Sequence, residues 1–484
     1  MSNPPSRRAL HPSLLVLVGF LTCQYLLIVL TPWYEPSGDE QYYVGRAAFL
    51  IEYGQFPKLN QTQRDLSAGK RLGFSDFRPP GYPLVLAAFG IPESGFAGKL
   101  TYCTTMYGLV AIILISMHLG ATAILPGSNW LYAVAAVLGI QPWTFEYIKN
   151  QLPDSLTMVL VTAGIGLLVF FIHRRSIRSA VVALIFATLL LSVPAMLRPE
   201  MLLFAVVLPA TGILLRTGRW HESLLFAAVV ACIVGCTVAA NVYYRWHVAQ
   251  ELRVYGTLRT PAPGLGEWMG TWIGTESDVG RVFNGVPLGK CSMPDIPARA
   301  FADNHERAAV AAIVERLNDG TPYNVDMDTA FFALAANRIR TSPFRYWLVP
   351  RIWTTFHLWG NLETNSQLLH ALVFVPRTPR RFFLGGLLAL KVALLLLSAF
   401  AALALWRRRR SCRLWYDNLA ILMLTLLVTR TVLMGFVFHS CEHRYMLVAW
   451  PACLWLSIYG TFHIVQGGIG LHGRLTAAVN PCEN

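Results

Sequence analysis

Charged residues are scarce in this chain. Asp, Glu, Lys and Arg together make up 14% of its 484 residues, while hydrophobic residues make up 55%. A soluble domain carries about a quarter charged residues. Most of the chain therefore cannot face water, which excludes a soluble globular protein.

Several common motifs are also missing. None of the nine cysteines forms a Cys-x-x-Cys pair, and the chain has no zinc-finger spacing, RNP-like motif, P-loop or fixed-period repeat. The net charge of +14 therefore indicates basic segments beside a membrane rather than a nucleic-acid partner. The first apolar stretch lacks a clear small-residue cleavage site, so we expect it to remain as a span.

Apolar stretches recur along the chain at about the length of twenty residues that one membrane crossing needs. They predict an all-α polytopic membrane protein with about ten transmembrane helices. The predicted spans are 13–31, 98–118, 129–147, 153–172, 179–197, 200–215, 222–243, 383–406, 416–438 and 446–465.

Basic residues in the short links predict the orientation. If the spans alternate, one side receives Arg7, Arg8, Arg174, Arg175, Arg178, Arg216, Arg219, Arg407 to Arg410 and Arg413. Cytoplasmic links are enriched in Lys and Arg. We therefore expect both termini in the cytoplasm, in a bacterial inner or plasma membrane.

This topology leaves two long extracytoplasmic segments, 32–97 and 244–382. It divides the chain into a transmembrane module at 1–243, a large loop at 244–382, and C-terminal helices with a cytoplasmic tail at 383–484.

Within the large loop, we expect loops and short helices over 244–325. Residues 326–343 predict an amphipathic helix lying on the membrane, and 344–362 an interfacial helix. Cys291 and Cys441 both fall outside the membrane; whether they form a disulfide stays open.

The first outer segment contains the clearest motif, Gly38-Asp39-Glu40-Gln41-Tyr42-Tyr43. Asp39 can cap a helix running to about Tyr53. A carboxylate at the membrane–water boundary on a rigid helix start suits general-base work. The alternative is that Asp39 is only a cap and Glu40 a solvated partner of the helix dipole.

A second motif, Asp76-Phe77-Arg78-Pro79-Pro80-Gly81-Tyr82-Pro83, follows. The proline pair enforces an extended turn and so holds Arg78 on a fixed backbone. A fixed guanidinium is a good phosphate ligand. The alternative is an interfacial turn whose Arg78 contacts lipid phosphates.

Two cations fall inside predicted spans. Arg430 lies about two turns from the outer end of its span, a depth at which charge is costly and usually functional. It could meet a lipid phosphate, pair with Glu200, or snorkel to the surface. For Lys391 we favour snorkelling, and for Arg198 a structural pair with Glu200.

The remaining polar groups near the outer boundary of the membrane indicate less about a functional site. Glu146 and Asp154 flank the link between the third and fourth predicted spans; we expect them to be solvated, and the alternative is that they help line the acceptor entrance. His443 follows Glu442 and is expected to be hydrogen-bonded rather than metal-bound. No second acidic cluster accompanies Asp39, so we expect no tightly bound divalent metal.

In their order along the chain and in the side of the membrane on which they are predicted to lie, these motifs resemble those of the GT-C membrane glycosyltransferases. The nearest resemblance is to the branch that contains the protein O-mannosyltransferases and the lipid A aminoarabinose transferase. The resemblance covers the topology of nearly the whole chain but only short stretches of sequence. Besides the two motifs of the first outer segment, it rests on Leu197-Arg198-Pro199-Glu200, Arg338-Ile339-Arg340-Thr341-Ser342-Pro343 and Glu442-His443-Arg444-Tyr445. Phe77 stands where some relatives place an acidic residue.

The resemblance implies a glycosyltransferase whose donor is a sugar on a polyprenyl phosphate and whose acceptor is an extracytoplasmic lipid, polysaccharide or protein. It assigns the general base to Asp39, with Glu40 as its partner. We expect inversion, because only one carboxylate is evident at the site. The expected phosphate ligands are Arg78, Arg444, Tyr445 and Arg430, and the expected substrate-lining residues are Tyr43, Tyr82, Arg198, Glu200, Glu442 and His443. Neither a cofactor nor a metal is expected.

Two other functions remain open. A transporter or flippase is disfavoured because the ionisable residues gather at the outer boundary and no paired halves are evident. An O-antigen ligase or polymerase would share the lipid-linked donor, and would be expected to depend more on basic residues of a large late loop.

Overall fold

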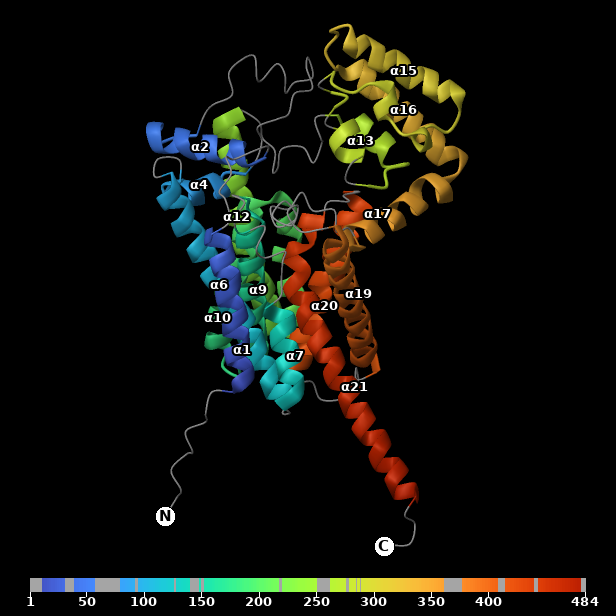
Figure 1. Cartoon of the computed structure of the whole chain (residues 1–484). Helices are drawn as coiled ribbons and strands as arrows, with labels where there is room; N and C mark the ends of the chain where they lie inside the picture. Colours follow the sequence, from blue (N-terminus) through green and yellow to red (C-terminus); the bar gives the residue numbers. More distant parts are fainter. Residues whose placement is uncertain are drawn as a thin grey trace, which may run out of the picture.

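A computed structural model describes residues 11–30, 39–56, 79–91, 95–125, 128–139, 148, 152–216, 220–249, 262–275, 278–283, 285–287, 289–360, 377–407, 414–438 and 443–479. All regular structure in these ranges is helical, without a strand (Figure 1). The predicted all-α class is confirmed.

Eight of the described helices contain stretches long and apolar enough to cross a membrane. They are α1 (Pro12–Leu30), α6 (Phe96–Ile124), α9 (Asp154–His173), α10 (Ile177–Leu197), α12 (Trp220–Ala249), α19 (Arg377–Arg407), α20 (Trp415–Val432) and α21 (Trp450–Val479). The protein is an integral, multi-pass membrane protein.

Two predicted spans correspond to shorter apolar helices. The span expected at 129–147 contains α7 (Ser128–Gly139), of 12 residues, and the span expected at 200–215 contains α11 (Leu202–Leu215), of 14 residues. α11 is shorter than the roughly twenty residues of a straight crossing, while residues 140–147 of the other expected span lie outside the described residues.

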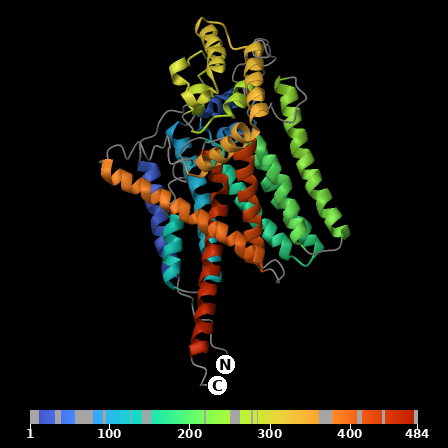
Figure 2. The same ribbon diagram turned by 90° about the vertical axis from the view of Figure 1, so that its right-hand side faces the viewer.

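The long helices pack into one bundle, and small residues allow their close approach (Figures 1 and 2). A Cβ added to Gly460 of α21 would collide with the backbone oxygen of Leu397 on α19. A Cβ added to Gly164 of α9 would lie 2.8 Å from Cγ of Leu191 on α10. Small residues at helix crossings are typical of membrane bundles, where van der Waals packing drives association.

A separate compact unit lies on one end of the bundle, as both views show (Figures 1 and 2). This head unit spans residues 262–341 and consists of α13 (Pro263–Met269), α15 (Asn304–Asn318), α16 (Val325–Thr341) and the short turns between them. Its hydrophobic core is distinct from that of the bundle and includes Trp268, Val310 and Phe331. The end of the bundle below it is called the head end.

The head unit changes two expectations for the large loop. Residues 326–343 do form a helix, but the apolar face of α16 packs into the core of the head unit instead of lying on the membrane, with Met327 and Phe331 at most 1% exposed. The stretch 244–325, expected to be loops and short helices, includes the 15-residue helix α15. An amphipathic pattern alone cannot distinguish a membrane surface from a neighbouring helix.

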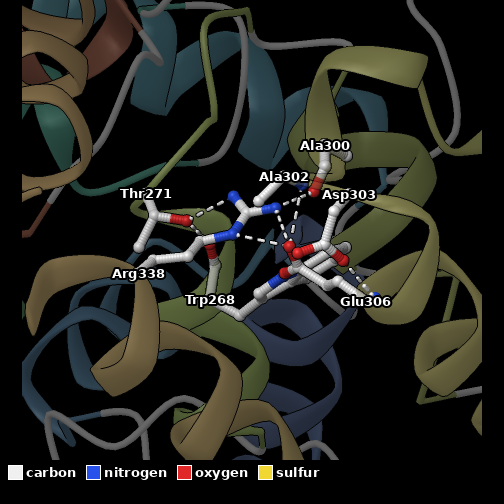
Figure 3. Close-up of polar contacts among 7 residues, drawn as sticks. All are labelled: Trp268, Thr271, Ala300, Ala302, Asp303, Glu306 and Arg338. Atoms are coloured by element: carbon white, nitrogen blue, oxygen red, sulfur yellow. Dashed lines mark hydrogen bonds and ion pairs between the residues drawn. The ribbon is translucent and has the colours of Figure 1, made fainter. Parts of the chain in front are cut away.

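An ion pair is buried inside the head unit (Figure 3). Arg338 donates from Nε and Nη2 to Oε2 of Glu306 at 3.0 and 2.7 Å, and from Nη1 to Oγ1 of Thr271 at 2.8 Å. Nη2 also donates to the backbone oxygen of Ala300. The other oxygen of Glu306, Oε1, accepts from Nε1 of Trp268 at 2.6 Å. Each nitrogen of this guanidinium therefore has an acceptor.

The π-helical turn η5 (Phe344–Leu348) and the helix α17 (Val349–Gly360) connect the head unit to the bundle. They correspond to the helix predicted at 344–362. α17 packs on η7 (Leu433–Val437), the π-helical continuation of α20, where a Cβ on Gly435 would collide with Oγ1 of Thr355. Nε of Arg351 also donates to the backbone oxygen of Phe436 at 3.2 Å.

The first long segment contributes α2 (Asp39–Tyr53) and α4 (Gly81–Ala88), at the same end of the bundle as the head unit (Figure 1). The helix predicted from Asp39 to about Tyr53 is confirmed. Gly54, at φ 65°, follows it in the left-handed conformation that favours glycine. α4 approaches α10 so closely that a Cβ on Gly81 would lie 2.6 Å from the backbone oxygen of Met196.

Candidate functional site: a buried charge cluster

Four ionisable side chains meet at the head end of the bundle. Asp154 is the first residue of α9, Arg198 follows α10, Glu200 lies in the 3-10 turn η1 (Pro199–Met201), and Arg430 lies in α20. We refer to these four residues as the charge cluster.

The cluster is a chain of alternating charges. Arg198 contacts both acids: Nη2 donates to Oδ2 of Asp154 at 2.7 Å, and Nη1 donates to Oε1 of Glu200 at 3.1 Å. Nη1 of Arg430 lies 3.6 Å from the same glutamate oxygen. Both pairings of Glu200 that the sequence left open, with Arg198 and with Arg430, therefore occur.

A break between two helices produces this geometry. Arg198 is extended, at φ −144° and ψ 118°, because the residue before a proline is disfavoured in the helical region. Pro199 then begins the turn that leads into α11. The break places Arg198 and Glu200 beside the start of α9.

The cluster is buried. Asp154 and Arg430 are 0% exposed and Arg198 is 9% exposed. Our expectation that Asp154 is solvated is wrong, because Arg198 neutralises it inside the bundle. Arg430 does not snorkel, and neither does Lys391, which is 2% exposed with Nζ 5.8 Å from the centre of the Trp450 ring. Packing against neighbouring helices retains these cations within the bundle.

The Arg430 guanidinium uses little of its donor capacity. Nε donates to the backbone oxygen of Tyr445 at 2.7 Å. Nη1 and Nη2 have no hydrogen-bond partner among the described residues, apart from the long ion contact of Nη1 to Glu200. The Tyr445 ring lies 4.9 Å from the Arg198 guanidinium carbon. One residue, Tyr445, thus contacts both arginines.

A row of tyrosines connects α2, α4 and α6 at the head end. The Tyr43 ring meets the Tyr82 ring edge-on at 5.0 Å between centres, and the hydroxyls of Tyr82 and Tyr102 are 2.8 Å apart. Burial is the largest cause that raises the pKa of the Tyr82 hydroxyl well above its ordinary value, and the charge of Asp154 contributes. The charge of Glu40 reaches Tyr102. The helix headed by Asp39 therefore packs on α4, whose Tyr82 hydroxyl meets that of Tyr102 on α6.

Part of the predicted site lies outside the described residues, namely Arg78, Glu442 and the side chains of Asp39, His443 and Arg444. The backbone of His443 begins the 3-10 helix η8 (His443–Ala449). The catalytic role of Asp39 and the phosphate-binding roles of Arg78 and Arg444 stay predictions. Glu146 and Cys441 also lie outside, while Cys291 is a free, buried thiol.

Within the described ranges, no group of three or more His, Cys, Asp or Glu side chains could hold a metal ion. The charge cluster instead brings two cations together with two acids. Its two arginines are fixed by Asp154, Glu200 and Tyr445, and one of them has donors available.

Asp154 is the residue that sequence reasoning missed. A signal was present, because Pro153-Asp154 directly precedes a long apolar run and the next two helices form a hairpin that returns to Arg198. The pairing of an acid at the start of one span with a base at the end of the next could have indicated it.

Comparisons with known proteins show a likeness to solved structures alone. No protein-family model matches the sequence, and no curated protein is similar to it. Among solved structures, the chain is similar to the crystal structure of ArnT from Cupriavidus metallidurans in the apo state, with 12% identity, coverage of 93% of this chain and 77% of that chain, and a TM-score of 0.32. A score this low supports no transfer of residue roles.

Proposed function

We propose that this protein is a GT-C-type membrane glycosyltransferase that moves a sugar from a polyprenyl-phosphate donor to an extracytoplasmic acceptor. The observation that carries the proposal is the fully buried Arg430, whose Nη1 and Nη2 lack hydrogen-bond partners among the described residues. A buried arginine with spare donors is costly unless a ligand completes it.

The chemistry of such a transfer needs fixed cations. As the bond from the anomeric carbon to the lipid phosphate breaks, negative charge accumulates on the departing phosphate oxygen. Arg430 and Arg198 are held at the head end by the contacts of the charge cluster, so they need little reorganisation when that charge develops. Arg78, Arg444 and Tyr445 are the further phosphate ligands of this proposal.

The acceptor hydroxyl needs a base. Asp39 heads α2, at the same end of the bundle as the charge cluster, and Tyr43 of this helix contacts Tyr82 of α4. In the proposal, Asp39 removes the hydroxyl proton while the oxygen attacks the anomeric carbon, and Glu40 supports it. A single in-line displacement inverts the anomeric centre. Neither a metal nor a cofactor takes part.

The proposal also fixes the orientation. The head end faces outside the cytoplasm and both termini face the cytoplasm of a bacterial cell. The acceptor is a lipid, polysaccharide or protein of the envelope. Tyr43 and Tyr82, which are 4% and 0% exposed, hold α2 and α4 in place beside the substrates.

The test is Asp39→Asn in a strain that lacks the native gene. Asparagine keeps the size of the side chain and its capping ability but removes the base, so the glycan product should fall at least about 100-fold. Mass spectrometry of envelope glycans measures the product. Glu52→Gln is the matched control, because Glu52 is an exposed carboxylate of the same helix.

Normal product from Asp39→Asn in correctly inserted protein would contradict the base assignment. Loss of product in the Glu52→Gln control would show that the assay reports on the integrity of α2 rather than on catalysis. A flippase would also behave differently, because its deletion would leave lipid-linked donor on the cytoplasmic leaflet while purified protein transferred no sugar.

A further inference from the structure

The connection between the head unit and the bundle exposes a row of large apolar side chains. Along η5 and α17 these are Phe344, Trp347, Val349, Ile352, Trp353 and Phe356, and their exposed fractions range from 40% for Ile352 to 69% for Phe356. We refer to these six residues as the aromatic stripe.

The stripe occupies one side of α17. Val349, Ile352, Trp353 and Phe356 follow the spacing of three to four residues that places side chains on one face of a helix. The opposite face is buried in the bundle, where Thr354 is 0% and Leu358 is 1% exposed. Nε1 of Trp359 on this buried face donates to Oγ1 of Thr431 on α20 at 3.2 Å. The stripe therefore lies on the side of α17 opposite the bundle, and one of its members, Trp353, lies beside the head unit, since a Cβ on Gly274 would be 3.1 Å from its Nε1.

The helix that carries the stripe packs beside a helical stretch whose own exposed surface is apolar. α17 packs on η7, and the helical stretch from α20 into η7 exposes Val428, Val432 and Val437 at 48% to 57%. This stretch is among those that cross the membrane. Aromatic side chains at the end of a span are typical of the boundary between acyl chains and head groups.

The charges around the stripe favour anionic lipid. Residues 339–360 contain no Asp or Glu but contain Arg340, Arg345, Arg351 and His357. Arg340 and Arg345 are exposed. Arg351 is buried and held by the bundle, and desolvation lowers its pKa to about 10. Within 339–360 the exposed charges are therefore cationic, while one exposed carboxylate outside this stretch, Glu267 of α13, is near enough for its charge to act on Arg351.

We propose that the aromatic stripe is seated in the lipid leaflet at the head end, and that Arg340 and Arg345 bind the phosphates of anionic lipid head groups there. The occupant is an anionic lipid surface. Because Trp353 of the stripe lies beside Gly274 of the head unit, a stripe fixed in the leaflet also fixes the height of the head unit. This inference does not rest on the proposed function.

The depth of the stripe tests the first half. A spin-labelled noncanonical residue is placed at Phe356 in the full chain, in nanodiscs of mixed zwitterionic and anionic lipid. The measured quantity is the ratio of the label's collision rate with oxygen to its collision rate with a water-soluble nickel chelate. At Phe356 this ratio should be as high as for a label at lipid-facing Val432. A label at Val325, which is 52% exposed in the head unit, is the aqueous control. A collision ratio at Phe356 equal to that at Val325 would overturn the proposal. So would the finding that another protein, in place of lipid, covers the stripe.

Lipid retention tests the second half. The protein in nanodiscs with equal anionic and zwitterionic lipid is extracted in mild detergent, and the retained lipids are counted by native mass spectrometry. Replacing Arg345 with Ala should lower the retained anionic lipid about fivefold, because one basic residue near an anionic leaflet contributes about 1 kcal/mol. Arg316→Ala, an exposed arginine of α15, should change nothing. Equal retention in both variants would refute the anionic preference.

Discussion

Two buried arginines in this protein differ in how completely they are satisfied. Arg338 in the head unit donates from all of its nitrogens to Glu306, Thr271 and Ala300. Arg430 in the bundle makes one short hydrogen bond, to Tyr445, and a 3.6 Å ion contact to Glu200. Both are at most 3% exposed. The two arginines are therefore alike in burial and differ in how many of their donors are used.

The comparison implies different consequences of removal. Arg338 is an integral part of the head unit, and its loss leaves the Glu306 carboxylate buried without its counter-ion. Arg430 contributes less to folding, because only one strong hydrogen bond depends on it. The following predictions separate these roles.

Arg338→Ala should have the largest effect on stability. Breaking a buried ion pair by removing one partner costs about 3–5 kcal/mol. The head unit should therefore become sensitive to protease at a much lower urea concentration, as measured by pulse proteolysis in nanodiscs. Arg316→Ala, which removes an exposed arginine of the same unit, should leave the midpoint unchanged. An Arg338→Ala variant as stable as the native protein would contradict the structural role of Arg338.

Arg430→Gln should act mainly on activity. Removing one fixed donor from a site where charge develops lowers turnover by about 100- to 1000-fold. Arg430→Lys should recover part of it, because a lysine supplies the charge but not the planar fork of donors. The readout is product formation per inserted molecule. If Arg430→Gln retained activity and lost stability like Arg338→Ala, Arg430 would be structural.

A double-mutant cycle on Asp154→Asn and Arg198→Gln measures how much of the charge cluster is structural. The pair lies at 2.7 Å with both partners buried, so the coupling in unfolding free energy should be about 1–3 kcal/mol. Arg198 also contacts Glu200, which limits the cost of losing Asp154 alone. A coupling near zero would mean that the cluster is held by helix packing instead.

The smallest expected effect is on the alkylation of Cys291, whose buried thiol reports whether the head unit is folded. Its thiol is 3% exposed, and burial raises its pKa to about 11. Because the thiolate is the reactive form, alkylation at pH 8 should be slow and should accelerate as the pH rises toward 11. In Arg338→Ala the thiol should react at pH 8, whereas in Arg430→Gln it should not. Rapid alkylation of the native protein would contradict the buried environment.

The sequence predicted where the helices lie better than it predicted which elements pack against them. Apolar length located the spans, and the residues from Asp39 to Tyr53 predicted α2, because both patterns are local. The partner of an amphipathic face is not local, so α16 was expected on the membrane but packs in the head unit. For the same reason Asp154, which is next to a link in sequence, was expected in water.

The charge cluster was predictable in part. The depth of Arg430 in its span indicated a buried cation, and Glu200 was among its candidate partners. The third partner required knowledge of which helices adjoin, because Asp154 and Arg198 are 44 positions apart. The roles of Asp39, Arg78 and Arg444 stay predictions.

The contact between Gly435 and Thr355 has an evolutionary consequence. A methyl group at position 435 would displace the Thr355 hydroxyl, which donates to the backbone oxygen of Arg351 at 2.8 Å. In homologous chains the two positions should therefore covary, with alanine or serine at 435 accompanied by a smaller residue at 355. Such coupled substitutions would allow this helix junction to be traced through sequences too divergent for any single motif to be aligned.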